Sequence, residues 1–104
     1  MKKIVNGKSY NTATATEVCD IGNGLSESDF GWHSSSVYVT KKGAFFLAGE
    51  GGPMSRWARQ HSDSRVAGSG IEVLSRGEAL KLAEFFQAPT DVIEEFFGDV
   101  IEDG

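Results

Sequence analysis

The clearest alternation of apolar and polar positions lies between residues 37 and 48. Two β-prone runs, VYVT and AFFLA, are separated by Lys41–Lys42–Gly43. This pattern predicts a hairpin whose three-residue loop ends on a glycine in the left-handed conformation. Because successive strand side chains point to opposite faces, Phe45 and Leu47 should share one face of the sheet, and Phe46 should lie on the other.

Shorter strands are predicted nearer the start of the chain. Lys3–Val5 and Lys8–Tyr10 flank Asn6–Gly7, a strong turn signal. The next segment, Asn11–Ile21, is ambiguous, because Thr14 and Glu17 have capping-box spacing for a helix. The run ATATEVCDI is rich in Thr and Val, which favours a strand over that helix.

The segment Gly22–Ser36 is predicted to be a loop. It is rich in Gly, Ser, Asn and Asp, residues that favour turns over regular elements. Phe30 and Trp32 are expected to fold back from this loop onto the core.

The stretch GAFFLAGEGGP predicts the end of a strand and the start of a short helix. Pro53 suits the first turn of such a helix. At helical spacing, one face would then carry Met54, Trp57, Ala58 and His61. A flexible loop, Ser62–Gly70, is expected to follow.

A short strand, Ile71–Leu74, and two helices complete the predicted chain. Ser75 and Glu78 have capping-box spacing at the start of the first helix. Its buried stripe should be Ala79, Leu82, Ala83 and Phe86. The second helix begins at Pro89–Thr90 and should point inward with Val92, Ile93, Phe96, Phe97, Val100 and Ile101. The predicted fold is α+β: a small antiparallel sheet centred on the 37–48 hairpin and packed by the two C-terminal helices.

Composition indicates a globular protein with one domain over residues 1–104. The chain is 39% hydrophobic and 24% charged, which is not the composition of a disordered segment. Cys19 is the only cysteine, so no internal disulfide can form and a cytoplasmic location is expected. The first residues lack the apolar stretch of a signal peptide, and no apolar run is long enough to span a membrane.

Charge is unevenly distributed along the chain, whose net charge is −5. From Glu78 onward, Lys81 is the only base among the acids Glu78, Glu84, Asp91, Glu94, Glu95, Asp99, Glu102 and Asp103. Direct nucleic-acid binding is therefore not expected, because such domains carry a basic face. The acids can form a solvated helix face, or they can bind a partner protein with a basic surface. The candidate partner-binding residues are Asp91, Glu94, Glu95, Asp99 and Glu102.

The glycine-rich segment is a second candidate site. GEGG lacks the Gly-Lys-Ser/Thr of a Walker loop and does not complete a dinucleotide fingerprint. A helix N-terminus after these glycines could bind an anion through free N–H groups, with two arginines close by. The residues of that weak anion site would be Gly51, Gly52, Arg56 and Arg59. A structural turn from strand to helix is the favoured interpretation.

No metal, cofactor or catalytic site is predicted. Cys19, His33 and His61 are scattered and have no paired ligand spacing. The stretches HSSS (His33–Ser36) and HSDS (His61–Ser64) contain the residue types of a serine nucleophile and its base. Sequence neighbours are not expected to share the geometry that such catalysis needs.

Two segments, NGKSYNTATATEV (Asn6–Val18) and VYVTKKGAFFLAGEGGPMSRWA (Val37–Ala58), resemble a widespread group of small bacterial and phage proteins. In that group a Gly-Lys-x-Tyr-Asn/Asp-Thr-x-Thr-Ala start precedes a Leu-Tyr-x-Thr-Lys-x-Gly-x-Phe-Leu hairpin, a glycine-rich segment and a Pro-Leu-Ser-x-x-Glu-Ala helix start. The matching positions are Lys8, Tyr10, Thr12, Tyr38, Thr40, Lys41, Gly43, Phe46, Leu47, Gly51, Gly52, Ser75, Glu78 and Ala79. The chain departs from the pattern at Val37, Val39 and Val73, where Leu, a basic residue and Pro are expected.

The resemblance implies a phage-type accessory protein, a class that includes anti-CRISPR inhibitors, and it implies no catalytic residues. Together with the acidic C-terminal part, it predicts a non-enzymatic inhibitor that binds a basic surface of a host nucleic-acid-handling complex. One alternative is a regulatory module that binds a small anion or nucleotide at Gly49–Arg59. Another is a self-associating structural subunit, such as a homodimer, built by pairing of sheet edges.

Overall fold

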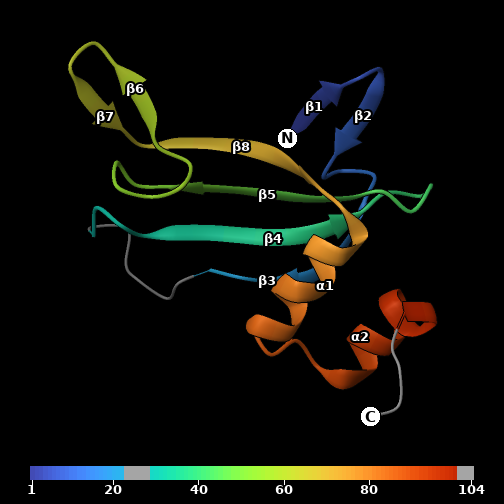
Figure 1. The fold of residues 1–104 in the computed structure, drawn as a ribbon. Helices are drawn as coiled ribbons and strands as arrows, with labels where there is room; N and C mark the ends of the chain where they lie inside the picture. Colours follow the sequence, from blue (N-terminus) through green and yellow to red (C-terminus); the bar gives the residue numbers. More distant parts are fainter. Residues whose placement is uncertain (23–28, 101–104) are drawn as a thin grey trace.

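The computed structural model of the chain describes residues 1–22 and 29–100. Its centre is a four-stranded antiparallel sheet with the strand order β3-β4-β5-β8 (Figure 1). These strands are β3 (Thr16–Asp20), β4 (His33–Val39), β5 (Phe45–Gly51) and β8 (Gly68–Leu74). Every neighbouring pair is antiparallel.

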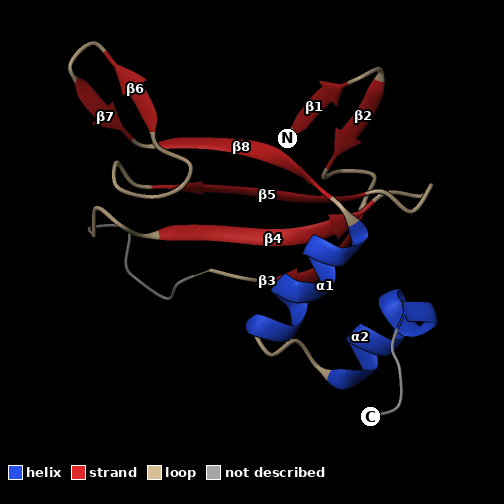
Figure 2. Cartoon of the chain, viewed as in Figure 1, coloured by secondary structure: helices blue, strands red, loops and turns tan. Residues whose placement is uncertain are grey.

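Two hairpins and a helical segment surround this sheet (Figure 2). The hairpins are β1 (Lys2–Val5) with β2 (Lys8–Asn11), and β6 (Arg59–His61) with β7 (Ser64–Val66). The helices are α1 (Arg76–Phe85), α2 (Thr90–Phe97) and the short 3₁₀ helix η1 (Gly98–Val100). The predicted α+β class, with an antiparallel sheet and two C-terminal helices, is confirmed.

The central hairpin forms as its pattern predicts. Val39 pairs with Phe45, and the loop closes through the Thr40 amide, which donates to the Ala44 carbonyl oxygen at 2.8 Å. Gly43 takes a φ of 87°, a left-handed conformation that costs a glycine little. The hairpin is longer than predicted, because β4 begins at His33 and β5 continues to Gly51.

The prediction of a loop over Gly22–Ser36 is wrong for its last residues. His33 to Ser36 belong to β4 because they pair with the extended end of β5. Phe30 does not fold back onto the core either, since 67% of its side chain is exposed. Trp32 is half-buried. Residues 23–28 of the predicted loop lie outside the described part of the chain.

The predicted first hairpin is confirmed, and the strand favoured for Asn11–Ile21 is confirmed only over Thr16–Asp20. Asn6 and Gly7 form the turn of the β1–β2 hairpin, with positive φ at both positions. The ambiguous segment contains the strand β3 rather than a helix. Thr14 and Glu17 therefore form no capping box; instead, the Thr14 amide bonds to the Asn11 carbonyl oxygen in a turn before the strand.

Each face of the main sheet buries its own apolar cluster. On one face, Phe45 and Leu47 pack with α1 and α2. The members of that cluster are Val18, Ile21, Val37, Phe45, Leu47, Trp57, Leu74, Ala79, Ala83 and Phe97. The opposite face buries Tyr10, Phe46, Ala48 and Ile71 beneath the β1–β2 hairpin. The predicted division of Phe45 and Leu47 from Phe46 is therefore confirmed, and it makes β5 the shared centre of both clusters.

The start of α1 is also as predicted. The Ser75 hydroxyl accepts from the Glu78 amide, and the Glu78 carboxylate accepts from the Ser75 amide, which completes a capping box. These hydrogen bonds hold the pKa of Glu78 below its usual value. Among the described residues, no helix has the length and apolar character needed to cross a membrane.

The end of α1 differs from the prediction that Phe86 is buried. Gln87 has a φ of 55°, and the Ala88 amide returns to the Ala83 carbonyl oxygen at 2.9 Å. This is a Schellman ending, which stops the helix and turns the chain toward α2. The last turn thus presents Phe85 and Phe86 to solvent, with 78% and 37% of their surface exposed.

We predict that Phe97 holds α2 on the sheet. Its side chain is fully buried and stacks on Phe45, with ring centroids 5.1 Å apart. Phe97→Ala removes this contact and leaves a cavity, so the free energy of unfolding should fall by about 3–5 kcal/mol in urea denaturation. The exposed Phe85 provides the control, because Phe85→Ala should change stability by about 0.5 kcal/mol or less. Equal effects of the two substitutions would contradict this packing.

Candidate functional site

The glycine-rich segment does not lead into a helix, so the predicted helix around residues 53–61 is wrong. Gly49 and Gly51 continue strand β5, and the residues that follow form turns before β6. Ser55 takes up the backbone groups that a helix would use: its hydroxyl donates to the Gly52 carbonyl oxygen at 2.7 Å and accepts from the Trp57 amide at 3.2 Å. A serine that bonds locally in this way competes with helix formation.

The glycines of this segment make room for Trp57. Gly49 pairs with Gly70 across β5 and β8, and a side chain at either position would press against the Trp57 indole. A Cβ atom on Gly49 would lie 2.7 Å from the indole nitrogen, and one on Gly70 would lie 3.3 Å from the ring. Trp57 is buried, whereas Met54 and His61, predicted to share its face, are exposed. Gly49 and Gly70 therefore form the surface on which the Trp57 ring packs.

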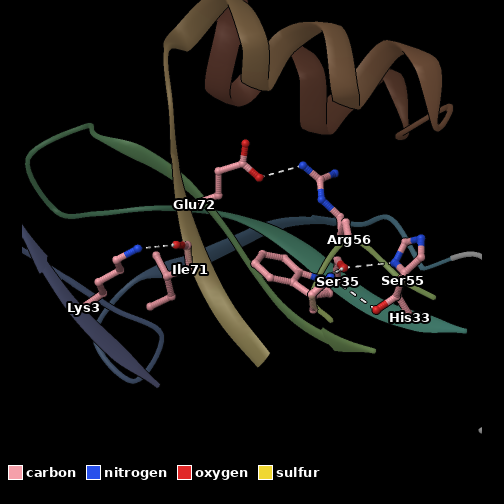
Figure 3. A network of polar contacts seen from close by, with 8 residues as sticks. Lys3, His33, Ser35, Ser55, Arg56, Ile71 and Glu72 are labelled. Carbon is pink, nitrogen blue, oxygen red and sulfur yellow. Dashed lines mark hydrogen bonds and ion pairs between the residues drawn. The ribbon is translucent and has the colours of Figure 1, made fainter. Parts of the chain in front are cut away.

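A buried polar link fixes the orientation of the indole. Trp57 Nε1 donates to Ser35 Oγ at 2.8 Å, and Ser35 Oγ lies 3.0 Å from His33 Nδ1 (Figure 3). Ser35 is 2% exposed, so its hydroxyl needs these protein partners. The pKa of His33 is lowered, first by burial, then by the nearby positive charge of Arg56, while Asp20 acts in the opposite direction.

One of the two neighbouring His and Ser pairs, His33 with Ser35, lies within hydrogen-bond distance, whereas the sequence predicted no shared geometry. His33 and Ser35 stand two positions apart on β4 and therefore project from the same face, within hydrogen-bond distance. The Ser35 hydroxyl is nevertheless buried and already accepts the Trp57 indole N–H. The observed role of this arrangement is to orient the Trp57 indole within the core. His61 and Ser64 lie on the exposed β6–β7 hairpin.

The residues predicted to bind an anion are placed differently from a helix N-terminus. Gly51 and Gly52 are buried, and the Gly52 amide donates to the Trp32 carbonyl oxygen at 2.9 Å. Arg56 pairs with Glu72 at 2.6 Å (Figure 3). Its guanidinium carbon lies 5.7 Å from the centroid of the Trp57 ring. Arg59 is exposed on β6. The two glycines therefore offer no anion cradle of the predicted kind.

The arginines do line an open groove with residues that the sequence pattern did not single out. Lys2 and Lys3 of β1 join Arg56 and Arg59 around a space of about 510 Å³ beside β8. Lys3 Nζ donates to the Ile71 carbonyl oxygen at 3.3 Å (Figure 3). Only the packing of the β1–β2 hairpin on the sheet brings these lysines there.

Among the described residues, no group of three or more His, Cys, Asp and Glu side chains could hold a metal ion. The pKa of the Cys19 thiol is raised, chiefly by burial and then by Glu17 and Asp20. A raised pKa keeps the thiol protonated at neutral pH, which makes it a poor nucleophile and a poor metal ligand.

The predicted partner-binding acids lie on the surface of α2 and η1. Asp91, Glu94 and Glu95 are exposed, and within the described part of the chain they form no ion pair. Asp99 is exposed as well, but it pairs with Arg76, whose guanidinium also donates to the Phe96 carbonyl oxygen. Glu102, and Ile101 of the predicted apolar stripe, lie outside the described residues. The acidic face of α2 thus consists of three unpaired carboxylates beside one paired carboxylate.

An aromatic pair stands next to these acids along the chain. The rings of Phe85 and Phe86 meet edge to face, with centroids 5.0 Å apart, at the end of α1. The pattern at this point hides the pair, because Phe86 fits the apolar stripe of an α1 helix that continues. The sequence signal for this ending is Gln87–Ala88–Pro89, which stops the helix directly after its C-cap residue Phe86.

Comparison of the chain with protein-family models, with curated proteins and with solved structures finds no match.

We predict that Gly49 is required for the Trp57 packing. In Gly49→Ala the new methyl group would lie 2.5 Å from the Ser34 carbonyl oxygen and 2.6 Å from Ser35 Oγ. Urea denaturation should show a loss of about 1–3 kcal/mol from overpacking. Gly77→Ala in α1 is the matched control, because nothing lies within 4 Å of its added Cβ. That control should leave stability unchanged or raise it slightly. If Gly49→Ala also left stability unchanged, the proposed packing of Trp57 on Gly49 would be contradicted.

We predict that His33 makes the fold sensitive to acid. The pKa of His33 in the folded state lies below its ordinary value of 6.5, so below about pH 6.5 the unfolded state binds more protons at this residue. The free energy of unfolding should therefore fall as pH decreases from 7 through 6.5. His33→Gln should reduce this fall in pH-dependent denaturation. His61→Gln, which also removes one imidazole but at an exposed position, is the control. Identical pH profiles of wild type and His33→Gln would contradict the prediction.

Proposed function

We propose that the chain is a non-enzymatic interaction protein whose C-terminal helices bind a basic surface on a partner protein. The proposal rests on two exposed features of the consecutive helices: the Phe85–Phe86 pair at the end of α1 and the unpaired acids of α2, which follow it along the chain. We call Phe85, Phe86, Asp91, Glu94 and Glu95 the helical face.

The composition of the helical face matches that of a protein-binding surface. Binding energy at interfaces is concentrated in a few large side chains, often aromatic ones, that lose contact with water. Phe85 has no packing role in the described core, so its side chain is available to contact a partner without a loss of core packing. Charged residues around such an anchor raise the association rate and select the partner by sign. The three carboxylates therefore favour a surface rich in Lys and Arg.

The surroundings of the face favour a rigid presentation. Phe97 anchors α2 to the sheet by stacking on Phe45. Arg76 joins α1 to η1 through Asp99, and to α2 through the Phe96 carbonyl oxygen. Rigid presentation reduces the entropy lost on binding. The acids are thus held in place before a partner arrives.

Surfaces rich in Lys and Arg are characteristic of proteins that bind nucleic acid. An acidic face bound there would compete with the nucleic acid for the same cations. This is the action expected of an inhibitor of the phage-type class that the sequence resembles. The proposed effect is therefore displacement of nucleic acid from a host complex.

Self-association by sheet edges is less favoured at β8. Lys3 donates to the Ile71 carbonyl oxygen, so a charged side chain already covers part of this edge. A charged group that covers an edge strand in this way opposes pairing with another chain. The alternative of an anion-binding regulatory module at Gly49–Arg59 loses its helix N-terminus and keeps only Arg56 and Arg59 in the open groove.

We predict that reversing the charge of the helical face abolishes partner binding. The variant combines Asp91→Lys, Glu94→Lys and Glu95→Lys, which leaves the Arg76–Asp99 pair intact. A tagged wild-type protein should retain a basic partner from a lysate of the organism that encodes the chain. The variant should retain at least about tenfold less, because like charges then face each other. Phe85→Ala should weaken retention without a change in charge.

The control combines Glu17→Lys, Glu50→Lys and Asp63→Lys, which makes the same change in net charge at exposed sites outside the helices. This control variant should retain the partner as well as the wild-type chain does. In a second assay, adding the wild-type chain to the partner bound to nucleic acid should release the nucleic acid. Equal retention by wild type, variant and control would refute the helical face as the binding site.

A further inference from the structure

Two hairpin turns that are far apart in the sequence meet at one pocket. The β1–β2 turn contributes Lys8, and the β4–β5 turn contributes Lys41 and Lys42. The pocket has a volume of about 410 Å³ and is lined further by Ser9, Tyr10, Thr14 and Thr40. We call it the lysine pocket.

The lysine pocket gathers positive charge without a compensating acid. None of its lining residues is Asp or Glu, and Lys8, Lys41 and Lys42 form no ion pair within the described part of the chain. Three ammonium groups around one concave space repel one another, and a concave wall concentrates their potential. An anion in the pocket would relieve that repulsion, so the pocket favours a negatively charged ligand.

The backbone that carries these lysines is well defined. The Thr40 hydroxyl accepts from the Ala44 amide at 3.1 Å, and the Gly43 amide donates to the Thr40 carbonyl oxygen at 2.9 Å. On the other side, Tyr10 is buried with its ring edge against Phe46, at a centroid distance of 5.6 Å. This contact docks the first hairpin on the sheet. The two turns are therefore held against each other by the core.

We propose that the lysine pocket binds phosphate groups, specifically those of a ligand that carries several phosphates in a row. A lysine ammonium binds phosphate as a compact point charge, and the rest of the pocket lining is uncharged. Three lysines suit a charge of about −3 better than a single carboxylate. The volume lies within the usual range of ligand sites, about 300–1,000 Å³.

The site goes beyond the proposed partner binding and is separate from it in the fold. No residue of the lysine pocket belongs to α1 or α2, and no residue of the helical face lines the pocket. Its residues come from the two segments that carry the sequence resemblance, NGKSYNTATATEV and VYVTKKGAFFLAGEGGPMSRWA. The two segments are far apart in the sequence, and the fold brings their lysines together.

The test is calorimetric titration of the full chain at low salt with inorganic triphosphate, with ATP and with a short single-stranded oligodeoxynucleotide. Two-dimensional amide NMR spectra locate the site. We expect saturable binding of triphosphate, with shifts of the amides of residues 7–10 and 40–44. Lys8→Gln with Lys41→Gln should weaken binding by about tenfold or more, since each lost charge contact removes a large part of the affinity. These exposed substitutions should leave the spectrum of the core unchanged.

Lys2→Gln with Lys81→Gln is the matched control, because it removes the same charge from exposed positions outside the pocket. It should bind triphosphate as tightly as the wild type. Binding of triphosphate and ATP without the oligonucleotide assigns the site to a free phosphorylated small molecule. Tighter binding of the oligonucleotide assigns it to the phosphate backbone of a strand. Absence of binding by all three probes overturns the proposal, and so does an equal loss in the pocket variant and the control.

Discussion

The contact on which much of this fold depends is that of the Trp57 indole with the glycines of β5 and β8. Gly49 and Gly70 let the ring approach the sheet, and Ser35 fixes its direction by accepting the indole N–H. The helices cover the part of this face around Phe45 and Leu47, and Trp57 covers the glycine-lined part. Because a buried indole needs both apolar contact and a hydrogen-bond acceptor, Trp57 constrains one position on each of three strands: Ser35 on β4, Gly49 on β5 and Gly70 on β8.

A second constraint is that both faces of the main sheet are covered by different kinds of element. The β1–β2 hairpin packs on Phe46, and the helices pack on Phe45 and Leu47. This division also separates the charges. Lysines of the hairpin turns line the pocket on one part of the molecule, while the carboxylates of α2 lie on the helical layer. A chain with a net charge of −5 can therefore present a cationic pocket, because net charge does not describe local potential.

Local patterns predicted the elements whose stability comes from neighbours in the sequence. The hairpin at residues 37–48, the Asn6–Gly7 turn and the capping box of Ser75 and Glu78 all form as expected. The pattern failed after Pro53, where helical spacing suggested one face for Trp57 and His61. There the contact of Trp57 with glycines on two strands outweighs a weak local preference. The pattern also failed at Phe86. This residue belongs to the predicted apolar stripe, but α1 ends at Phe85 and the Phe86 side chain is exposed.

The sequence by itself determined the α+β class, the exposure of the α2 acids and the absence of paired metal-ligand spacing, since these depend on alternation, helical period and composition. Only the tertiary structure decided what the glycines are for, which acid pairs with Arg76, and that Lys8 meets Lys41 and Lys42. The physical reason is distance along the chain. Periodicity reports which face a side chain takes within its own element, whereas a pocket or an ion pair between elements depends on how those faces dock.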